Sequence, residues 1–195
     1  KNYLELIGSA PLLLKTLPRY YMIEICPKTP YTPIYRPPLV EDAKIMSLEE
    51  FSIIIEKISR FSDDAIISLS LYGEPLEHPQ FVEIIKKSLS YNKMSFLIET
   101  HGNKKEWQEK LDAIKEIALS SPKRSSLLRP LYWITSIDAT KWETYGKVYN
   151  VEEEEAKLLL KTAYEMAERA SSIFGNSSYV QIVRMLENED DLEDF

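Results

Sequence analysis

The sequence predicts an α/β fold built on a parallel sheet. Strand-like and helix-like segments alternate in the order β-α-β-α-β-α-β-α-β, which is typical of strands joined by helical crossovers. The second strand-like segment, residues 65–71, is a nearly continuous apolar run, as expected in a parallel sheet covered on both faces. The 195 residues suffice for one substantial core, so we expect a single domain over residues 1–195. This pattern fits either a doubly wound sheet or a piece of a (β/α) barrel.

The N-terminal part of the chain contains three different kinds of segment. An apolar stretch over Tyr3–Leu17 predicts a helix that stops before Pro18. Aromatic and β-branched residues dominate residues 20–25, which predicts the first strand. The prolines of residues 27–38 fix φ and remove hydrogen-bond donors, so this segment is expected to be a long loop.

The helices that follow have recognisable ends. Ser47 and Glu50 have the spacing of a capping box, so a helix is expected to begin directly after Ser47. Pro79 suits the first position of the next helix. Asn150 is a suitable N-cap for a long final helix, and Gly175 is suited to end it. The other predicted elements are helices over residues 81–89 and 107–118 and strands over residues 94–99, 131–138 and 178–185.

Composition and charge narrow the classes of function. The net charge is −7 and the basic residues form no stripe, so nucleic acid is not an expected partner. No apolar run approaches the ~20 residues that span a bilayer, so no membrane partner is expected either. A single cysteine and no signal-peptide layout predict a cytoplasmic protein. The chain begins at Lys1 without Met and stops within an acidic run, which suggests a piece of a longer protein.

Polar residues gather where the predicted strands end. Ligands of parallel α/β folds bind at the carboxyl ends of the strands, so these residues are the candidate site. Gly73 permits a backbone turn or a close approach that other residues do not, and Pro75 stiffens that turn. The candidates are Tyr72, Gly73, Glu74, Pro75 and His78 after the second strand, Glu99 and His101 after the third, Ser136 and Asp138 after the fourth, and Arg184 on the fifth.

Five motifs resemble the radical SAM superfamily, whose members are partial (β/α) barrels that use S-adenosylmethionine and an iron–sulfur cluster. They cover the chain from about Tyr20 to its end, with most similarity to the SPASM-containing, peptide-modifying branch. "IEICPKT" is similar to the first family strand and "LYGEPLEHP" to its Gly-Gly-Glu-Pro motif. "IETHG", "ITSIDATKWETYGKVY" and "VQIVRMLENEDDLEDF" are similar to the third, fourth and fifth strands. The resemblance implies an incomplete (β/α) barrel of parallel strands, truncated after about five strands.

The chain departs from this family at the cluster. Family members hold iron with three thiolates spaced Cys-x3-Cys-x2-Cys. With Glu24 aligned to the glutamate of the family's first strand, those positions fall on Thr29, Pro33 and Arg36, and Cys26 stands alone three residues earlier. The chain is therefore similar to spiro-SPASM proteins, and we expect no iron–sulfur cluster in it.

The resemblance also implies a ligand. In the family, the Gly-Glu-Pro segment holds the amino group of S-adenosylmethionine, which makes this molecule the candidate cofactor. The residues carried over to its site are Tyr72, Gly73, Glu74, Pro75, Glu99, His101, Ser136, Asp138 and Arg184. In a purely structural interpretation, Glu99 and Asp138 pair with Arg184 or a lysine, and His101 hydrogen-bonds a neighbouring loop.

Three functions remain open at this stage. The first is a non-catalytic domain that binds a ligand or a peptide, or serves as a scaffold for a downstream domain of a larger SPASM-type protein. The second is a radical SAM enzyme whose cluster ligands lie outside this chain. The third is a metal-dependent enzyme that uses His78, His101 and the carboxylates of the strand ends.

Overall fold

The computed structural model describes residues 18–38, 42–102, 106–121 and 129–194. The predicted helix over Tyr3–Leu17 lies outside these residues. The strands are β1 (Tyr20–Met22), β2 (Ile66–Ser68), β3 (Ser95–Thr100), β4 (Leu131–Ser136) and β5 (Ser178–Gln181). The α-helices are α2 (Leu48–Ser59), α3 (Phe81–Leu89), α4 (Trp107–Ser120), α5 (Trp142–Tyr149) and α6 (Glu153–Phe174). Short 3₁₀ segments are η1 (Pro75–Glu77), η2 (Gly175–Ser177) and η3 (Leu186–Asp194).

The five strands form one parallel sheet in the order β1-β2-β3-β4-β5. A doubly wound sheet reverses its strand order at a switch point, whereas here each strand pairs with the next along the chain. Sequential parallel pairing with helical crossovers is the arrangement of a (β/α) barrel. The predicted incomplete barrel of five parallel strands is thereby confirmed.

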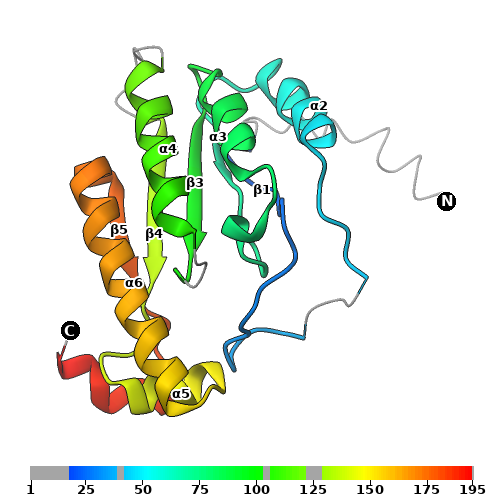
Figure 1. Cartoon of the computed structure of the whole chain (residues 1–195). Helices are drawn as coiled ribbons and strands as arrows, with labels where there is room; N and C mark the ends of the chain where they lie inside the picture. Colours follow the sequence, from blue (N-terminus) through cyan, green and yellow to red (C-terminus); the bar gives the residue numbers. More distant parts are fainter. Residues whose placement is uncertain (1–17, 39–41, 103–105, 122–128, 195) are drawn as a thin grey trace, which may run out of the picture.

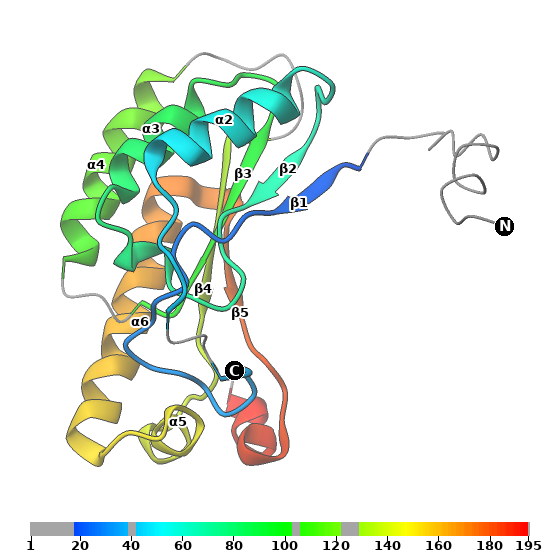
Figure 2. The same ribbon diagram turned by 90° about the vertical axis from the view of Figure 1, so that its right-hand side faces the viewer.

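Four helices cover one face of this sheet. Figures 1 and 2 show α2, α3, α4 and α6 on the same side, and α5 and η3 beyond the carboxyl ends of the strands. Apolar faces of these helices meet the strands in a core that includes Phe51, Ile55, Ile84 and Trp133, all with no exposed surface. Trp133 also stacks on Phe174 at the end of α6. The helices therefore leave the carboxyl edge of the sheet to the loops.

The helix ends confirm two predictions and correct two others. The capping box of Ser47 and the end of α6 at Gly175 (φ 54°) are as expected. Pro79 is not a first helical position, because α3 begins at Phe81 after the turn η1. Asn150 does not begin α6: it has φ 52° and ends α5. Asn tolerates this left-handed conformation, so it serves as a C-cap there.

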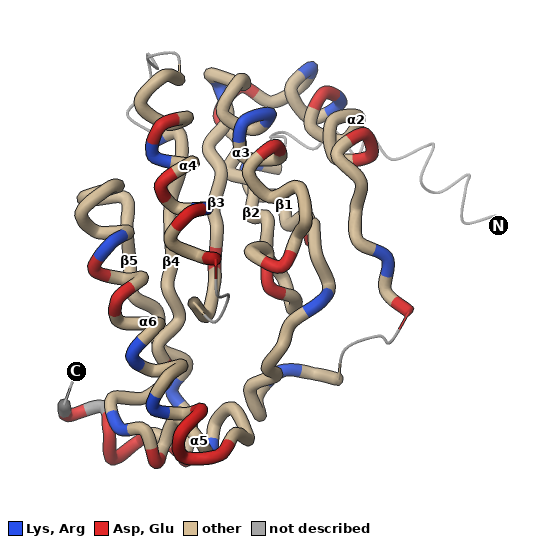
Figure 3. The backbone as a smooth tube through the Cα atoms, viewed as in Figure 1, with Lys and Arg blue, Asp and Glu red and all other residues tan. Residues whose placement is uncertain are grey.

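Charged residues lie mainly on the helices and the connecting segments (Figure 3). Among the five strands that the structure describes, Glu99 is the one charged residue. It lies one residue before the end of β3. Within the described residues, no helix is both long and apolar enough to cross a bilayer.

Candidate functional site at the carboxyl ends of the strands

The turn after β2 passes so close to the first loop that it requires a glycine. A Cβ atom on Gly73 would lie 1.9 Å from the carbonyl oxygen of Cys26 and 2.6 Å from backbone atoms of Pro27. The next residue continues this contact, because the Glu74 amide donates to the Lys28 carbonyl at 2.7 Å. Gly73 therefore lets the chain after β2 pack against the chain after β1, and this juxtaposition places the Glu74 side chain.

The Glu74 carboxylate ties the turn to the end of β3. It is fully buried, and it accepts hydrogen bonds from the amides of Leu76 (3.1 Å) and His101 (3.0 Å). Burial raises the pKa of Glu74 from 4.5 to about 6, although these amides, the Thr100 hydroxyl and the charge of Arg36 favour the ionised form. Both carboxylate oxygens thus have partners within the protein.

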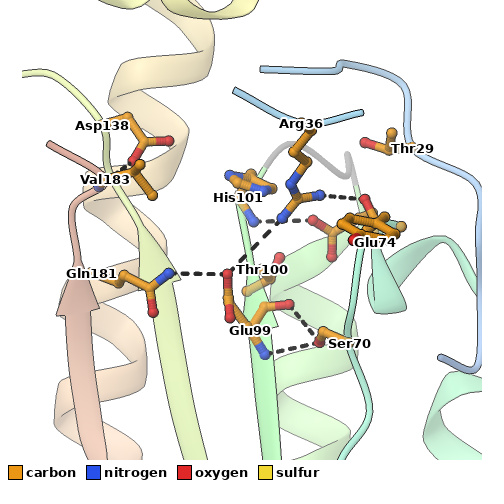
Figure 4. Close-up of polar contacts among 12 residues, drawn as sticks. Thr29, Arg36, Ser70, Glu74, Glu99, Thr100, His101, Asp138, Gln181 and Val183 are labelled. Atoms are coloured by element: carbon orange, nitrogen blue, oxygen red, sulfur yellow. Dashed lines mark hydrogen bonds and ion pairs between the residues drawn. The ribbon is translucent and has the colours of Figure 1, made fainter. Parts of the chain in front are cut away.

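Arg36 brings a positive charge from the proline-rich loop to the strand ends. Its side chain is only 7% exposed, and its Nη1 donates to the carbonyl of Tyr72. Its Nη2 lies 3.9 Å from the Oε1 of Glu99, as an ion pair. Figure 4 shows the guanidinium lying between Glu74, His101 and Glu99. A guanidinium therefore lies in the region where the family resemblance places the third cluster thiolate.

Glu24 closes the other side of the same turn. Its Oε1 accepts hydrogen bonds from the amides of Tyr72 and Gly73, each at 2.7 Å. The amides of the turn thus point to an internal carboxylate, while the carbonyl of Tyr72 points to an internal guanidinium. The amides of Tyr72 and Gly73 and the carbonyl of Tyr72 are thus paired within the chain.

Asp138 joins three parts of the chain at the end of β4. Its Oδ2 accepts hydrogen bonds from the hydroxyls of Tyr35 and Tyr149, both at 2.8 Å. Its Oδ1 accepts one from the amide of Val183 at 2.9 Å. Asp138 has no exposed surface, so these hydrogen bonds replace the water that its charge would otherwise require.

The predicted pairing of Glu99 or Asp138 with Arg184 is wrong. Arg184 forms an exposed ion pair with Glu189 instead, because β5 ends three residues earlier, at Gln181. Glu99 is paired with Arg36, and it also accepts a hydrogen bond from Gln181 Nε2 at 3.1 Å. Burial raises the pKa of Glu99, whereas Arg36 opposes that rise.

The two histidines have different positions and opposite tautomers. The single hydroxyl proton of Tyr149 goes to Asp138, so the 2.6 Å contact with His101 is a hydrogen bond from His101 Nδ1–H. Burial and the charge of Arg36 hold the pKa of His101 well below its usual range, so its Nε2 is an unprotonated acceptor, and the described residues provide no hydrogen-bond partner for it. His78 instead donates from Nε2 to the Met46 carbonyl and accepts the Gln80 amide at Nδ1.

His78 therefore fixes the chain before α3 and stands apart from the strand-end cluster. Across the described ranges, no three His, Cys, Asp or Glu side chains are grouped as a metal site would need. The proposed metal-dependent enzyme has no ligand set in this part of the chain.

The donor atoms do not fit an iron–sulfur cluster. Cys26 is the one cysteine of the chain, and burial raises the pKa of its thiol, which disfavours the thiolate that iron requires. Two of the three aligned cluster positions carry polar side-chain atoms. Thr29 donates a hydrogen bond to the Tyr31 carbonyl at 2.7 Å, and Arg36 is a cation. No step through such a cluster follows from these residues.

The sequence analysis missed several members of this site. Tyr35 lies in the proline-rich loop and Tyr149 at the end of α5, and both reach Asp138. Gln181 lies within a predicted strand and Arg36 at an aligned cluster position, and the structure shows that both contact Glu99. A buried carboxylate needs hydrogen-bond donors, so the sequence indicates that donors to Asp138 and Glu99 exist. Periodicity does not show which side chains lie close enough to donate.

Comparisons with known proteins support the fold. No family model matches the chain. An uncharacterized protein of Treponema pallidum (strain Nichols) is 34% identical over 199 residues, which cover 100% of this chain and 54% of that protein. The chain thus spans about half the length of this curated relative.

Solved structures with a similar fold include complexes with ligands. Streptococcus suis SuiB has a TM-score of 0.58 at 12% identity, with 91% of this chain and 36% of that chain covered. SuiB bound to the precursor peptide SuiA has a TM-score of 0.56 at 14% identity and the same coverage. BtrN in complex with AdoMet and 2-DOIA has a TM-score of 0.51 at 18% identity, covering 73% of this chain and 55% of that chain. The chain therefore has the fold of these proteins, an incomplete barrel of parallel strands.

Proposed function

We propose that this chain is a radical-SAM-like domain of a larger protein that acts without an iron–sulfur cluster, as a non-catalytic peptide-binding or scaffolding domain. The observation that carries the proposal is the position of Arg36, whose guanidinium binds the Tyr72 carbonyl and pairs with Glu99. The expected partners are a downstream domain of the parent protein and a peptide. A peptide is also the ligand of one solved structure with this fold, SuiB bound to SuiA.

The same arginine disfavours S-adenosylmethionine. This molecule carries an ammonium and a sulfonium besides its carboxylate, and the resemblance assigns its ammonium to the turn that contains Tyr72 and Gly73. That carbonyl already accepts from a cation, and two like charges in a poorly hydrated site repel each other. The carboxylate of Glu74 is fully buried, and each of its oxygens already accepts one backbone amide.

Retained S-adenosylmethionine binding is the second candidate function. It is favoured by the tight turn at Gly73 and by BtrN, whose structure contains AdoMet. In this case Arg36 would have to leave the Tyr72 carbonyl before the ligand could enter.

Anaerobic reconstitution and calorimetry test both functions. We expect purified protein treated with iron and sulfide to retain no iron, because the chain has one cysteine. We also expect wild-type protein to release no heat with S-adenosylmethionine. Retained iron with iron–sulfur absorption would overturn the cluster-free function.

Two variants test whether Arg36 is the group that prevents S-adenosylmethionine from binding. Arg36→Gln removes the charge at the strand ends, so heat that appears only in this variant would show that Arg36 excludes the ligand. Arg60→Gln is the matched control, because Arg60 pairs with Glu56 on the exposed surface of α2. Heat from wild-type protein would instead support the second function.

A further inference from the structure

The proline-rich loop, residues 27–38, holds Arg36 at the strand ends, and two of its contacts lie directly beside Arg36. The Tyr35 hydroxyl donates to Asp138 at 2.8 Å, and the Ile34 amide donates to the Val148 carbonyl at 2.9 Å. Ile34 and Pro37, which flank Tyr35 and Arg36, are exposed, so the outer face of the loop lies in solvent. Arg36 thus reaches a buried site from a surface loop.

The groups around the Arg36 side chain are almost all acceptors. The Tyr72 carbonyl and the Glu99 carboxylate contact the guanidinium directly, and the buried Glu74 carboxylate interacts with its charge. The unprotonated Nε2 of His101 is a further buried acceptor, and no donor in the described part of the chain reaches it. Without Arg36, buried negative charge would remain uncompensated, which is strongly unfavourable.

We infer that Arg36 is an internal pseudo-ligand, and that the partner of this site is a peptide whose arginine replaces it when the loop moves aside. This inference rests on the proposed peptide-binding function and specifies its ligand. A guanidinium presents five donors in a planar fork and bonds a carbonyl and a carboxylate at once, which a lysine ammonium cannot match in geometry. A tyrosine before the arginine would take the place of Tyr35 as a hydrogen-bond donor to Asp138.

The test uses peptides that copy the loop. Acetyl-Ile-Tyr-Arg-Pro-amide reproduces residues 34–37, and the same peptide with citrulline is its neutral isostere. We expect Arg36→Ala to bind the arginine peptide at least about tenfold more tightly than the citrulline peptide by calorimetry. Wild-type protein should bind neither at the same concentrations, because its own loop competes at a high effective concentration.

Equal affinity of Arg36→Ala for the two peptides would overturn the inference, and so would no binding of either. Should Arg36→Ala not fold, Arg36→Gln keeps the length of the side chain and is measured in the same way against the same criteria. The result is independent of the iron measurement. If the protein retains no iron and Arg36→Ala does not bind the arginine peptide, the pseudo-ligand inference is refuted, whereas the proposed cluster-free function is not.

Discussion

Single residues at the strand ends carry charges that are unusual for a protein interior. Glu74 is fully buried and accepts two backbone amides, and the burial of its carboxylate outweighs these bonds in raising its pKa to about 6. The folded protein therefore binds more protons than the unfolded chain between pH 4.5, the ordinary pKa, and about 6. Ionised Glu74 is a source of instability at neutral pH.

This charge predicts a pH dependence of folding. The contribution of Glu74 favours the folded state below pH 4.5 and is lost as the pH rises through about 6, for a total of ~2 kcal/mol. Urea unfolding between pH 4.5 and 7 should show this slope in the wild type and a flatter one in Glu74→Gln. Glu187→Gln removes an exposed carboxylate and serves as control. Identical slopes in wild type and Glu74→Gln would contradict the assignment.

Among the elements, α2 is the one whose start follows most directly from sequence. The Ser47 hydroxyl accepts the Glu50 amide at 3.1 Å, and Glu50 accepts the Ser47 amide at 2.8 Å. The helix buries Phe51, Ile55 and Ile58 against the sheet, so its start also sets the register of part of the core. Local hydrogen bonds and tertiary packing agree at this helix.

The cap predicts a modest and reversible loss of stability. Ser47→Ala leaves the first turn of α2 with an unpaired amide, and we expect the free energy of unfolding to fall by about 1 kcal/mol. Ser47→Asp retains an acceptor for the Glu50 amide and should restore most of that loss. Chemical denaturation of the three proteins checks this, and an alanine variant as stable as the wild type would refute it.

At the scale of the whole molecule, Asp138 holds the carboxyl edge of the barrel together. It bonds Tyr35 of the proline-rich loop, Tyr149 of α5 and Val183 after β5. Tyr35 and Val183 are more than 140 residues apart along the chain, so one carboxylate joins segments whose proximity no local sequence pattern encodes.

Weakening this junction should loosen all three segments together. Asp138→Asn removes the charge and leaves one acceptor oxygen for three donors, and we expect a loss of about 3 kcal/mol in unfolding free energy. Hydrogen exchange should speed up in residues 27–38, in α5 and after β5 at once. Asp190→Asn, at an exposed position, is the control. Faster exchange confined to one segment would show that the three are held independently.

The alternation of strands and helices, the parallel sheet and the cap of α2 follow from the amino-acid sequence alone, because apolar periodicity and local hydrogen bonds are properties of neighbouring residues. The sequence also shows the lack of thiolates for an iron–sulfur cluster. It does not show that Asn150 ends a helix, that Arg184 lies in an exposed ion pair, or that Arg36 compensates Glu99. These points depend on the folded chain, because the partner of a buried charge is set by which loops meet in space.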